Sequence, residues 1–416
     1  MQLATVLKQA KKLVTPTKKE QKKINQIVRE VKKKINFVIK KEGYAAKLLV
    51  GGSVAKGTWL PNISDIDFFL IFDYSKYADK SAELSFYTKK ILEKVWTKIN
   101  CLKGSRDYFS TTFDKYNLEF IPVLDISGGK QAKNITDYSP LHIAYVQKAK
   151  CKTDIRLAKQ FMKAVKVYGA ESYIGGFSGH LADLLVIYYG SFLNLINAAA
   201  NWPAKVILDP AKHYQNENEI LQKLSKEKTI GPLILVDPIE KDRNAAAALT
   251  FEKFDKFRKA AREFLKNPSL NFFKIPKFSI KNVKKTCAGN KIIIFSRKTP
   301  KGKKDVVGAQ MKKIFENLKK EFLSHDFEII TCDWEFDFTK HITYFWFCFP
   351  NKPLSKKKVL FGPPLHVSKE HINKFKQKWK NVKIEKERLV AEIKRKYLKP
   401  EQLAKNLFKK FGVKII

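Results

Sequence analysis

The pattern of apolar and polar residues predicts a chain that begins with an amphipathic helix and continues into buried strands. Thr17 and Glu20 have the spacing of a capping box, so a helix should begin at Thr17 and run to about residue 41. Apolar segments then predict strands at residues 48–50, 65–72 and 116–124, with a helix between them at residues 87–99. The apolar flanks of the second and third strands indicate that they lie inside a sheet.

The middle of the chain has the spacing of helices. Residues 154–168 place apolar side chains on one face and basic side chains on the other. The basic stripe consists of Arg156, Lys159, Lys163 and Lys166. Residues 181–195 are nearly all apolar and predict a central helix, and an alanine-rich helix should begin after Arg243. A basic stripe is usually a solvated face, and it becomes a binding surface where a polyanion lies opposite.

The composition changes at residues 268–276, where proline, asparagine and phenylalanine cluster, and this change predicts a domain boundary. Beyond it the pattern predicts a strand, an amphipathic helix, two strands, a Gly-Pro-Pro turn, a helix and a strand pair. These elements are expected at residues 292–296, 307–322, 327–333, 341–349, 368–380 and 382–397. The β-α-β-β order suggests a ferredoxin-like module.

Composition narrows the class of protein. The chain has 416 residues, enough for two or three domains, and 82 Lys+Arg against 40 Asp+Glu give a net charge of +42. The electrostatic field of so large a net charge favours a polyanion as the binding partner. A lysine-rich surface can also reflect the composition of the genome or growth at high temperature. The five cysteines are far apart and form no C-x-x-C pair, which favours a reducing compartment without structural zinc. No apolar run approaches ~20 residues, so we expect a cytoplasmic protein without a membrane segment.

The candidate chemistry lies between residues 51 and 72. Asp65 and Asp67 stand at i and i+2 on a predicted strand, so their carboxylates project from the same face. Two such acids repel each other unless a divalent cation lies between them. The Gly51-Gly52-Ser53 turn ahead of them offers backbone N–H groups to a phosphate, so the pair of features indicates nucleotide chemistry. If the strand that carries Glu119 runs antiparallel beside them, a third carboxylate joins the site.

Several motifs together resemble one family. GGSVAKGTW followed by SDID matches the G-S-x(11)-D-x-D signature of the polymerase-β-like nucleotidyltransferases, and LEFIPV resembles their third acidic strand. DYSPLHIAYV, RLAKQFMKAVKVYGAES, GGFSGHLADLLVIYYGSF, VDPIEKDRNAAAAL and LFGPPLHV are similar, in order and spacing, to the archaeal class I tRNA nucleotidyltransferases. The resemblance covers about residues 15–400.

The resemblance implies an α+β multidomain fold. It implies a polymerase-β-like catalytic head at residues 1–145, a helical neck at 146–266 that selects the nucleotide, and a ferredoxin-like body with a tail at 267–416 that binds tRNA. Enzymes of this family add C, C and A to the 3′ end of tRNA from CTP and ATP, with magnesium and without a nucleic-acid template. Lysines interleaved with aromatic residues in the last third suit backbone contacts to an acceptor stem.

The resemblance also implies roles for individual residues. Asp65, Asp67 and Glu119 would bind two Mg²⁺ ions and form the catalytic centre. The nucleotide's phosphates would be held by Ser53, Lys56, His142, Lys159 and Tyr168. Arg243 would read the edge of the incoming base together with the tRNA backbone.

Several of these residues also have an alternative interpretation in which they only stabilise the fold. The acids would form ordinary salt bridges at a strand end, His142 would be a satisfied core histidine, and Arg243 would cap the alanine-rich helix. The family normally has aspartate where Glu119 stands, so Asp114 and Asp125 are alternatives for the third ligand.

Two other functions share the head motif. One is another template-independent RNA nucleotidyltransferase that adds poly(A), oligo(U) or 2′-5′ linkages. The other is a catalytically silent RNA-binding homologue, which would have no reason to keep repelling carboxylates together. The sequence leaves the oligomeric state open, with a homodimer as one alternative.

Overall fold

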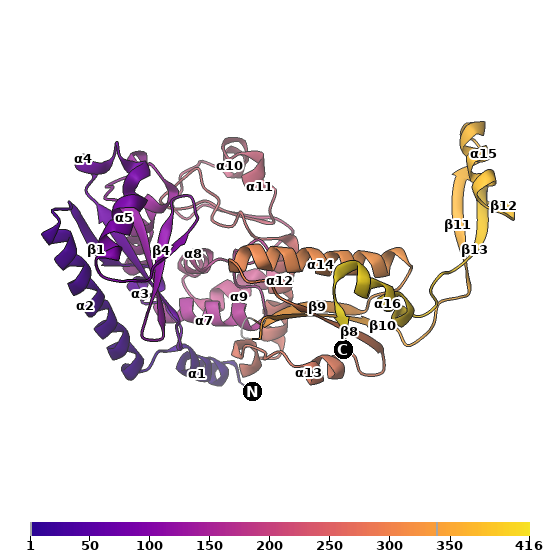
Figure 1. Cartoon of the computed structure of the whole chain (residues 1–416), viewed down its shortest axis with the longest axis horizontal. Coiled ribbons are helices and arrows are strands. Elements are labelled where there is room, and N and C mark those ends of the chain that lie inside the picture. Colours follow the sequence, from indigo (N-terminus) through magenta and orange to yellow (C-terminus); the bar gives the residue numbers. More distant parts are fainter. Residues whose placement is uncertain (1, 338–339) are drawn as a thin grey trace. The chain divides into compact units, whose positions relative to one another are not determined.

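The computed structural model describes residues 2–337 and 340–416, which form two compact units, Met1–Pro276 and Lys277–Ile416 (Figure 1). The division lies at the end of the stretch in which the change of composition predicted a boundary. Further division of the first unit into a head and a neck stays a prediction, as do the limits 145 and 266.

The first unit begins with a five-stranded sheet of order β1-β2-β5-β4-β3. Its strands are β1 (Ala46–Val50), β2 (Asp65–Phe72), β3 (Asn100–Leu102), β4 (Tyr108–Phe113) and β5 (Tyr116–Leu124). β2 and β5 pair in parallel, and the other neighbours pair antiparallel. The sheet is therefore mixed, and its central pair is the parallel one.

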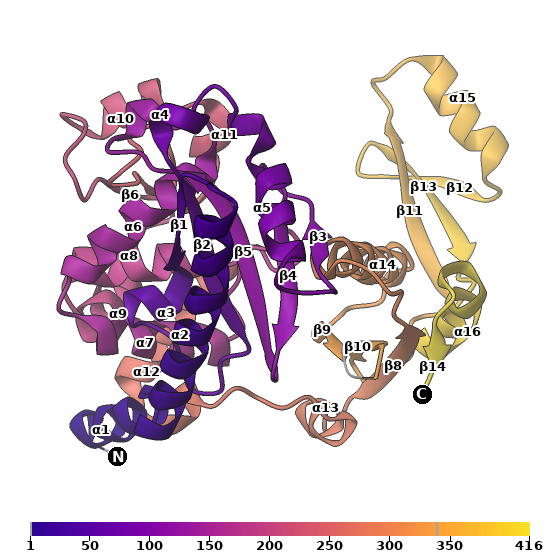
Figure 2. The ribbon, with the colours of Figure 1, turned by 60° about the vertical axis from the view of Figure 1, so that its left-hand side comes forward.

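Two helices cover one face of this sheet, α2 (Lys18–Lys41) and α5 (Leu84–Glu93) (Figure 2). The capping box predicted at Thr17 and Glu20 is present, and α2 ends where the pattern predicted. α5 ends before the predicted residue 99, because the chain turns there into β3. Ile66, Phe68 and Leu70 of β2 are buried under these helices, so the alternating residues, Asp65 and Asp67 among them, belong to the opposite face.

Short elements connect or flank the sheet. They are α3 (Gly52–Lys56), α4 (Tyr74–Tyr77), α6 (Ser139–Lys148), and the 3₁₀ turns η1 (Ser81–Glu83), η2 (Gly129–Gln131) and η3 (Ile135–Tyr138). α1 (Leu3–Val14) instead packs in the core of the helical part, through Val6, Ala10 and Val14. α6 lies on the face that carries the acids, where Ile143 packs with Phe69 and Val123. α1 was not predicted from the sequence.

The rest of the first unit is mainly helical. It contains α7 (Lys152–Ala164), α8 (Gly179–Tyr189), α9 (Phe192–Asn201), α10 (Glu217–Lys223), α11 (Lys226–Thr229), α12 (Phe251–Lys266) and η4 (Leu270–Phe273), with the strand pair β6 (Val206–Leu208) and β7 (Leu233–Leu235). Phenylalanines from α7, α9, α12 and η4 fill its core, among them Phe161, Phe192, Phe264 and Phe273.

Three predictions about these helices need correction. The apolar helix predicted at residues 181–195 is two helices, because Gly190 takes a left-handed conformation (φ 81°) and Ser191 caps α9. The helix predicted at 154–168 ends at Ala164. The alanine-rich stretch after Arg243 forms turns, and the next helix begins only at Phe251.

The second unit contains two further sheets. The larger one has the order β14-β8-β10-β9, and the smaller one has the order β11-β13-β12. The elements are α13 (Ile280–Thr286), β8 (Lys291–Lys298), α14 (Lys304–Ser324), β9 (Thr331–Asp337), β10 (Ile342–Phe349), β11 (Lys357–Pro364), α15 (Lys369–Lys378), β12 (Val382–Glu385), β13 (Arg388–Lys394), α16 (Pro400–Phe411) and β14 (Lys414–Ile415). The predicted order of strand, helix, strand and strand is present as β8, α14, β9 and β10. The predicted Gly-Pro-Pro turn is wrong, because its residues form the end of β11, and α13, β11, α16 and β14 were not predicted.

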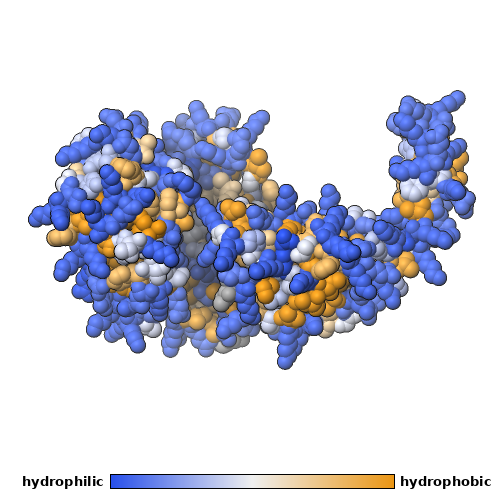
Figure 3. Space-filling view, viewed as in Figure 1, coloured by the Kyte–Doolittle hydropathy of each residue, from blue (hydrophilic) through white to orange (hydrophobic). Residues whose placement is uncertain are grey.

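Hydrophilic residues dominate the face of the molecule that Figure 3 draws, as the charge of the chain requires. Among the described residues, no single helix is long and apolar enough to cross a membrane. One bent pair, α8 and α9, passes the same test by length and composition alone, with a bend of 94°.

Candidate active site

The pairing of β2 with β5 brings the three predicted acids together. Asp67 lies opposite Glu119 in the register, and Asp65 lies opposite Asn117. The Nδ2 atom of Asn117 donates hydrogen bonds to Asp65 Oδ1 and to Glu119 Oε1, each at 3.2 Å. The antiparallel pairing expected from the sequence is wrong, since the strands are parallel, but the parallel register places Glu119 beside the aspartate pair all the same.

The alternative third acids lie elsewhere. Asp114 is in the turn between β4 and β5 and forms an ion pair with Lys23 at 2.9 Å. Asp125 follows the far end of β5 and pairs with Lys47 at 2.6 Å. Glu119 is therefore the acid of this strand that lies next to Asp67.

The acids are held in a repulsive arrangement. Burial and, to a smaller extent, the charge of Asp65 raise the pKa of Asp67 to about 6, and the charge of Lys56 opposes them. A cluster of carboxylate oxygens is the donor set that hard divalent cations such as Mg²⁺ prefer. The three acids thus fit a magnesium site, because a bound cation would remove the repulsion.

The glycine turn packs directly against this cluster. Gly51 N–H donates to the backbone oxygen of Asp67 at 2.7 Å. Gly52 has φ 51°, and a Cβ atom there would come within 1.7 Å of Asp67 Oδ2. Only glycine fits at this position, and the close approach places Ser53, the next residue, beside the acids.

Two cavities adjoin Asp67 and contain nearly all the other predicted site residues. The first, about 250 Å³, is lined by Ser53, Asp65, Asp67, Lys159, Lys163 and Tyr168 among others. The second, about 380 Å³, is lined by Gly52, Lys56, Asp67, His142, His180 and Arg243 among others. Each cavity is thus lined by residues from both the predicted head and the predicted neck.

One buried carboxylate connects the two cavities. Asp183 of α8 is 1% exposed, and its Oδ2 atom lies 2.9 Å from Lys56 Nζ while its Oδ1 atom lies 2.7 Å from Lys159 Nζ. Lys159 also donates to Thr58 Oγ1 at 2.9 Å. Burial lowers the pKa of Lys159 and opposes the ionisation of Asp183, yet the two lysines together keep the pKa of Asp183 below its ordinary value.

Tyr168 and Lys163 complete the first cavity. Burial raises the pKa of Tyr168, so its hydroxyl keeps its proton and can donate a hydrogen bond. Lys163 Nζ lies 5.1 Å from the centre of the Tyr168 ring, and burial lowers its pKa while Asp65 raises it. The sequence analysis included Lys163 in the basic stripe but assigned it no role. In the structure its ammonium group lies next to the ring of Tyr168.

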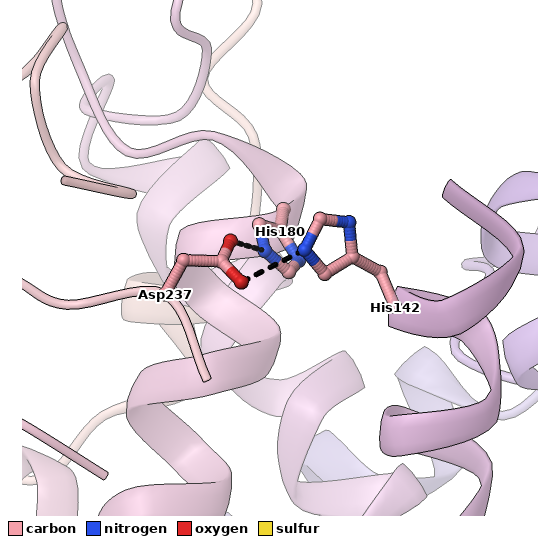
Figure 4. A group of neighbouring side chains, drawn as sticks. All are labelled: His142, His180 and Asp237. Atoms are coloured by element: carbon pink, nitrogen blue, oxygen red, sulfur yellow. Dashed lines mark hydrogen bonds and ion pairs between the residues drawn. The ribbon is translucent and has the colours of Figure 1, made fainter. Parts of the chain in front are cut away.

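His142 and His180 line the second cavity and form a His–Asp–His cluster with Asp237 (Figure 4). His142 of α6 and His180 of α8 point toward Asp237, with Nε2–oxygen distances of 2.8 and 2.9 Å. Burial lowers the pKa of His180 to about 4, so this ring is neutral at physiological pH, whereas the two histidines hold the pKa of Asp237 low.

The three ligand atoms of this cluster lie within 4.8 Å of one another, close enough to bind one metal ion. Two imidazoles and one carboxylate suit a transition metal more than magnesium. A ligating imidazole normally donates its other ring N–H to an acceptor, but His180 Nδ1 is buried without a hydrogen-bond partner. The cluster therefore suits a hydrogen-bonded role for Asp237 better than a metal site.

Arg243 lines the second cavity and follows Asp237 closely in the chain. Its Nη1 atom is 3.9 Å from Asp237 Oδ2 and 3.8 Å from Glu240 Oε2, and its side chain is 30% exposed. The structural interpretation of Arg243 as a helix cap is wrong, because residues 245–249 are not helical. The side chain can therefore reach a ligand.

Sequence reasoning missed Asn117, His180, Asp183 and Asp237. Asp183 did carry a signal, because it is an acid inside the apolar stretch 181–195, and a buried acid needs a cation. The other residues have no comparable local signal, and only the fold shows what they contact.

The fold and the carboxylate cluster define a nucleotidyltransferase. Residues 24–119 match the nucleotidyltransferase domain family, residues 153–274 match the second domain of tRNA nucleotidyltransferases, and residues 288–415 match the C-terminal domain of CCA-adding enzymes. A solved structure of Cid1, an RNA terminal uridylyl transferase, matches 65% of this chain and 95% of its own with a TM-score of 0.50 at 13% identity. The first unit thus has a polymerase-β-like nucleotidyltransferase fold.

Curated relatives extend the match over most of the chain. The CCA-adding enzyme of Nanoarchaeum equitans is 32% identical over 343 residues, which are 82% of each chain. The CCA-adding enzyme of Methanothermobacter thermautotrophicus is 28% identical over 407 residues, 96% of this chain and 87% of its own. This chain belongs to the family of CCA-adding enzymes.

Proposed function

We propose that Asp65, Asp67 and Glu119 form the catalytic centre of template-independent CCA addition to tRNA, with CTP and ATP as the nucleotide substrates. Membership of the family supports the activity itself. The observation that carries the assignment of the centre is the register of β2 and β5, which gathers three carboxylates beside a glycine turn at the junction of two cavities.

The transferred group moves in one displacement. The 3′ oxygen of the tRNA bonds to the α-phosphorus of the nucleotide, the bond to the bridging oxygen breaks, and pyrophosphate leaves. Two Mg²⁺ ions, held by the three acids, would supply Lewis-acid activation of the hydroxyl and stabilise the leaving oxygens. The carboxylate of Glu119 helps to take the proton from the 3′-hydroxyl.

The cavities divide the remaining tasks. Ser53, Lys159 and Tyr168 hold phosphate oxygens in the first cavity, where the neutral Tyr168 hydroxyl donates a hydrogen bond. Lys56 and His142 act from the second cavity. Because Asp237 binds Nε2 of His142, the Nδ1 atom is the ring nitrogen left for a phosphate. Lys56 meets phosphate as a point charge, where the family often has an arginine that binds with two N–H groups.

Arg243 selects the base. Its side chain lies in the second cavity with its guanidinium partly exposed, close to Asp237 and Glu240. A guanidinium offers hydrogen-bond donors in a fixed plane, and it can bind acceptors on the edge of an incoming base, such as N3 of cytosine or N1 of adenine. In this proposal a pocket of protein, completed by the tRNA backbone, replaces a template.

The remaining parts of the proposal concern architecture and partners. We assign residues 1–145 to a catalytic head, 146–266 to a helical neck, and 267–416 to a ferredoxin-like body and tail that bind the tRNA backbone. The basic charge of the chain supports this assignment. The cytoplasm is the expected location, and a homodimer remains one alternative for the oligomeric state.

The test is nucleotide incorporation on a tRNA that ends at its discriminator base. With CTP alone the product should gain two residues, with CTP and ATP three, and extension should then stop. Runs of A beyond one residue would favour the poly(A)-type alternative. The absence of any incorporation would favour the RNA-binding homologue, although neither alternative is supported by the names of the relatives.

A further inference from the structure

Asp183 is a buried acid to which the proposed reaction assigns no role. It lies on α8, among apolar residues of the same helix, and its two oxygens contact lysines from two other elements, α3 and α7. Those lysines line different cavities, Lys56 the second and Lys159 the first. One carboxylate thus anchors a cation in each of the two cavities that meet at Asp67.

The contacts of Lys56 and Lys159 hold each ammonium group in place, but they do not use all three of its N–H donors. Lys159 donates one hydrogen bond to Thr58 and forms an ion pair with Asp183 Oδ1 at 2.7 Å, and an ammonium group has three N–H groups. Lys56 has Asp183 as its partner among the described residues. Each lysine therefore keeps at least one donor for a ligand that enters its cavity.

A purely stabilising role does not explain this arrangement. Burying three charged groups costs desolvation that their mutual attraction repays poorly, and apolar residues of similar size would often be as stable. The group of two cations and one acid has a net positive charge, which suits an anionic ligand.

We propose that Asp183 is a positioning residue that holds the ammonium groups of Lys56 and Lys159 in place for the phosphates of the incoming nucleotide. This inference rests on the proposed function, which assigns both lysines to the triphosphate. It adds that the two cavities receive parts of one triphosphate, because one carboxylate fixes both cations.

Asp183 also keeps Lys159 charged. The titratable groups that face Lys159 are Lys56 on α3, Lys163 on α7 and Asp183 on α8, and only Asp183 favours the protonated form. Tyr168 and Cys151 face Asp183, and both have a raised pKa, so they stay neutral. Without the acid, Lys159 should lose its proton at a lower pH.

The test uses Asp183→Asn in the full chain, with CTP binding measured by calorimetry in the presence of Mg²⁺ between about pH 6.5 and 9. The Kd for CTP should rise about 10–100-fold, the range for loss of charge-assisted hydrogen bonds, and should rise further with pH, more steeply than in the parent. kcat at saturating CTP should change much less than KM. The matched control is Asp154→Asn, a partly buried acid of α7 that caps α9 through Phe192 N–H, and it should leave the Kd and its pH profile unchanged.

The outcomes separate this inference from the proposed function. If Lys56→Met and Lys159→Met weaken CTP binding while Asp183→Asn has the parental Kd and pH profile, Asp183 is only structural. If both lysine variants also bind CTP like the parent, the triphosphate assignment itself is wrong. Should Asp183→Asn not fold, Asp183→Glu keeps the charge but displaces the lysines, so its Kd should rise several-fold with an unchanged pH profile. A parental Kd in Asp183→Glu would overturn the positioning role.

Discussion

Removal of the charge of Asp67 should stabilise the metal-free protein. The folded-state pKa of this acid is about 6 against an ordinary value of 3.8, because the carboxylate is buried and lies near Asp65. The folded state thus binds the proton more tightly than the unfolded state does, and stability is lost as pH rises from about 4 to about 6. At about 1.4 kcal/mol per pKa unit, the penalty at pH 7.5 is at most about 3 kcal/mol, and at pH 5 it is about half as large.

The perturbation is Asp67→Asn, which replaces the carboxylate by a neutral group of nearly the same shape. We expect a gain in the free energy of unfolding of up to about 3 kcal/mol at pH 7.5 and a smaller gain at pH 5. The assay is urea-induced unfolding of the full chain in EDTA at both pH values, fitted with a separate transition for each unit. Addition of Mg²⁺ should stabilise the parent and should do little for the variant.

The matched control is Asp125→Asn, an exposed acid paired with Lys47 at 2.6 Å. Loss of a surface ion pair should change stability by less than about 1 kcal/mol, and in the destabilising direction. If Asp67→Asn is instead less stable than the parent at pH 7.5, or if its gain does not grow with pH, the site does not destabilise the charged form of Asp67 and the reasoning is wrong.

Three further predictions concern the reaction and the RNA. Glu119→Gln should abolish turnover but keep CTP binding, and Glu119→Asp should keep measurable activity, in primer-extension and binding assays; an active Glu119→Gln together with a dead Asp125→Asn would show that the third ligand is misassigned. Arg243→Ala should raise incorporation of U or G relative to C and A in single-nucleotide assays, whereas a uniform loss of activity would contradict a role in base selection. If roughly 6–10 phosphates are contacted, tRNA affinity in filter binding should fall about 10³–10⁵-fold between about 50 and 200 mM salt, and a flat dependence would show that the net charge is not a binding footprint.

Features set by a few neighbouring residues could be predicted from the sequence. The capping box at Thr17 and the extent of the strand at residues 116–124 agree with the structure. In each case the physical cause acts within a short stretch of chain.

Features that depend on distant parts of the chain could not be predicted. The direction of β5 relative to β2 depends on how the chain crosses between them, and the apolar pattern of a buried strand is the same in both directions. The ion pair between Lys56 and Asp183 joins residues that are 127 positions apart in the chain. No rule about residue spacing predicts a contact of this kind. The break between α8 and α9 is a different case, because Gly190 and Ser191 do carry local capping signals, but the apolar residues on both sides masked them.

The register that builds the core of the sheet is also what assembles the acids. Phe68 pairs with Phe120 directly after the pair Asp67 and Glu119, and the two rings stack on the opposite face at 5.3 Å between centroids. A slip of one residue would move the acids to the apolar face and the phenylalanines to the cavities, which would cost far more than the repulsion of three carboxylates. Burial of Phe68 and Phe120 therefore offsets the strain of the acid cluster, and the sheet can keep the carboxylates together even before a cation binds.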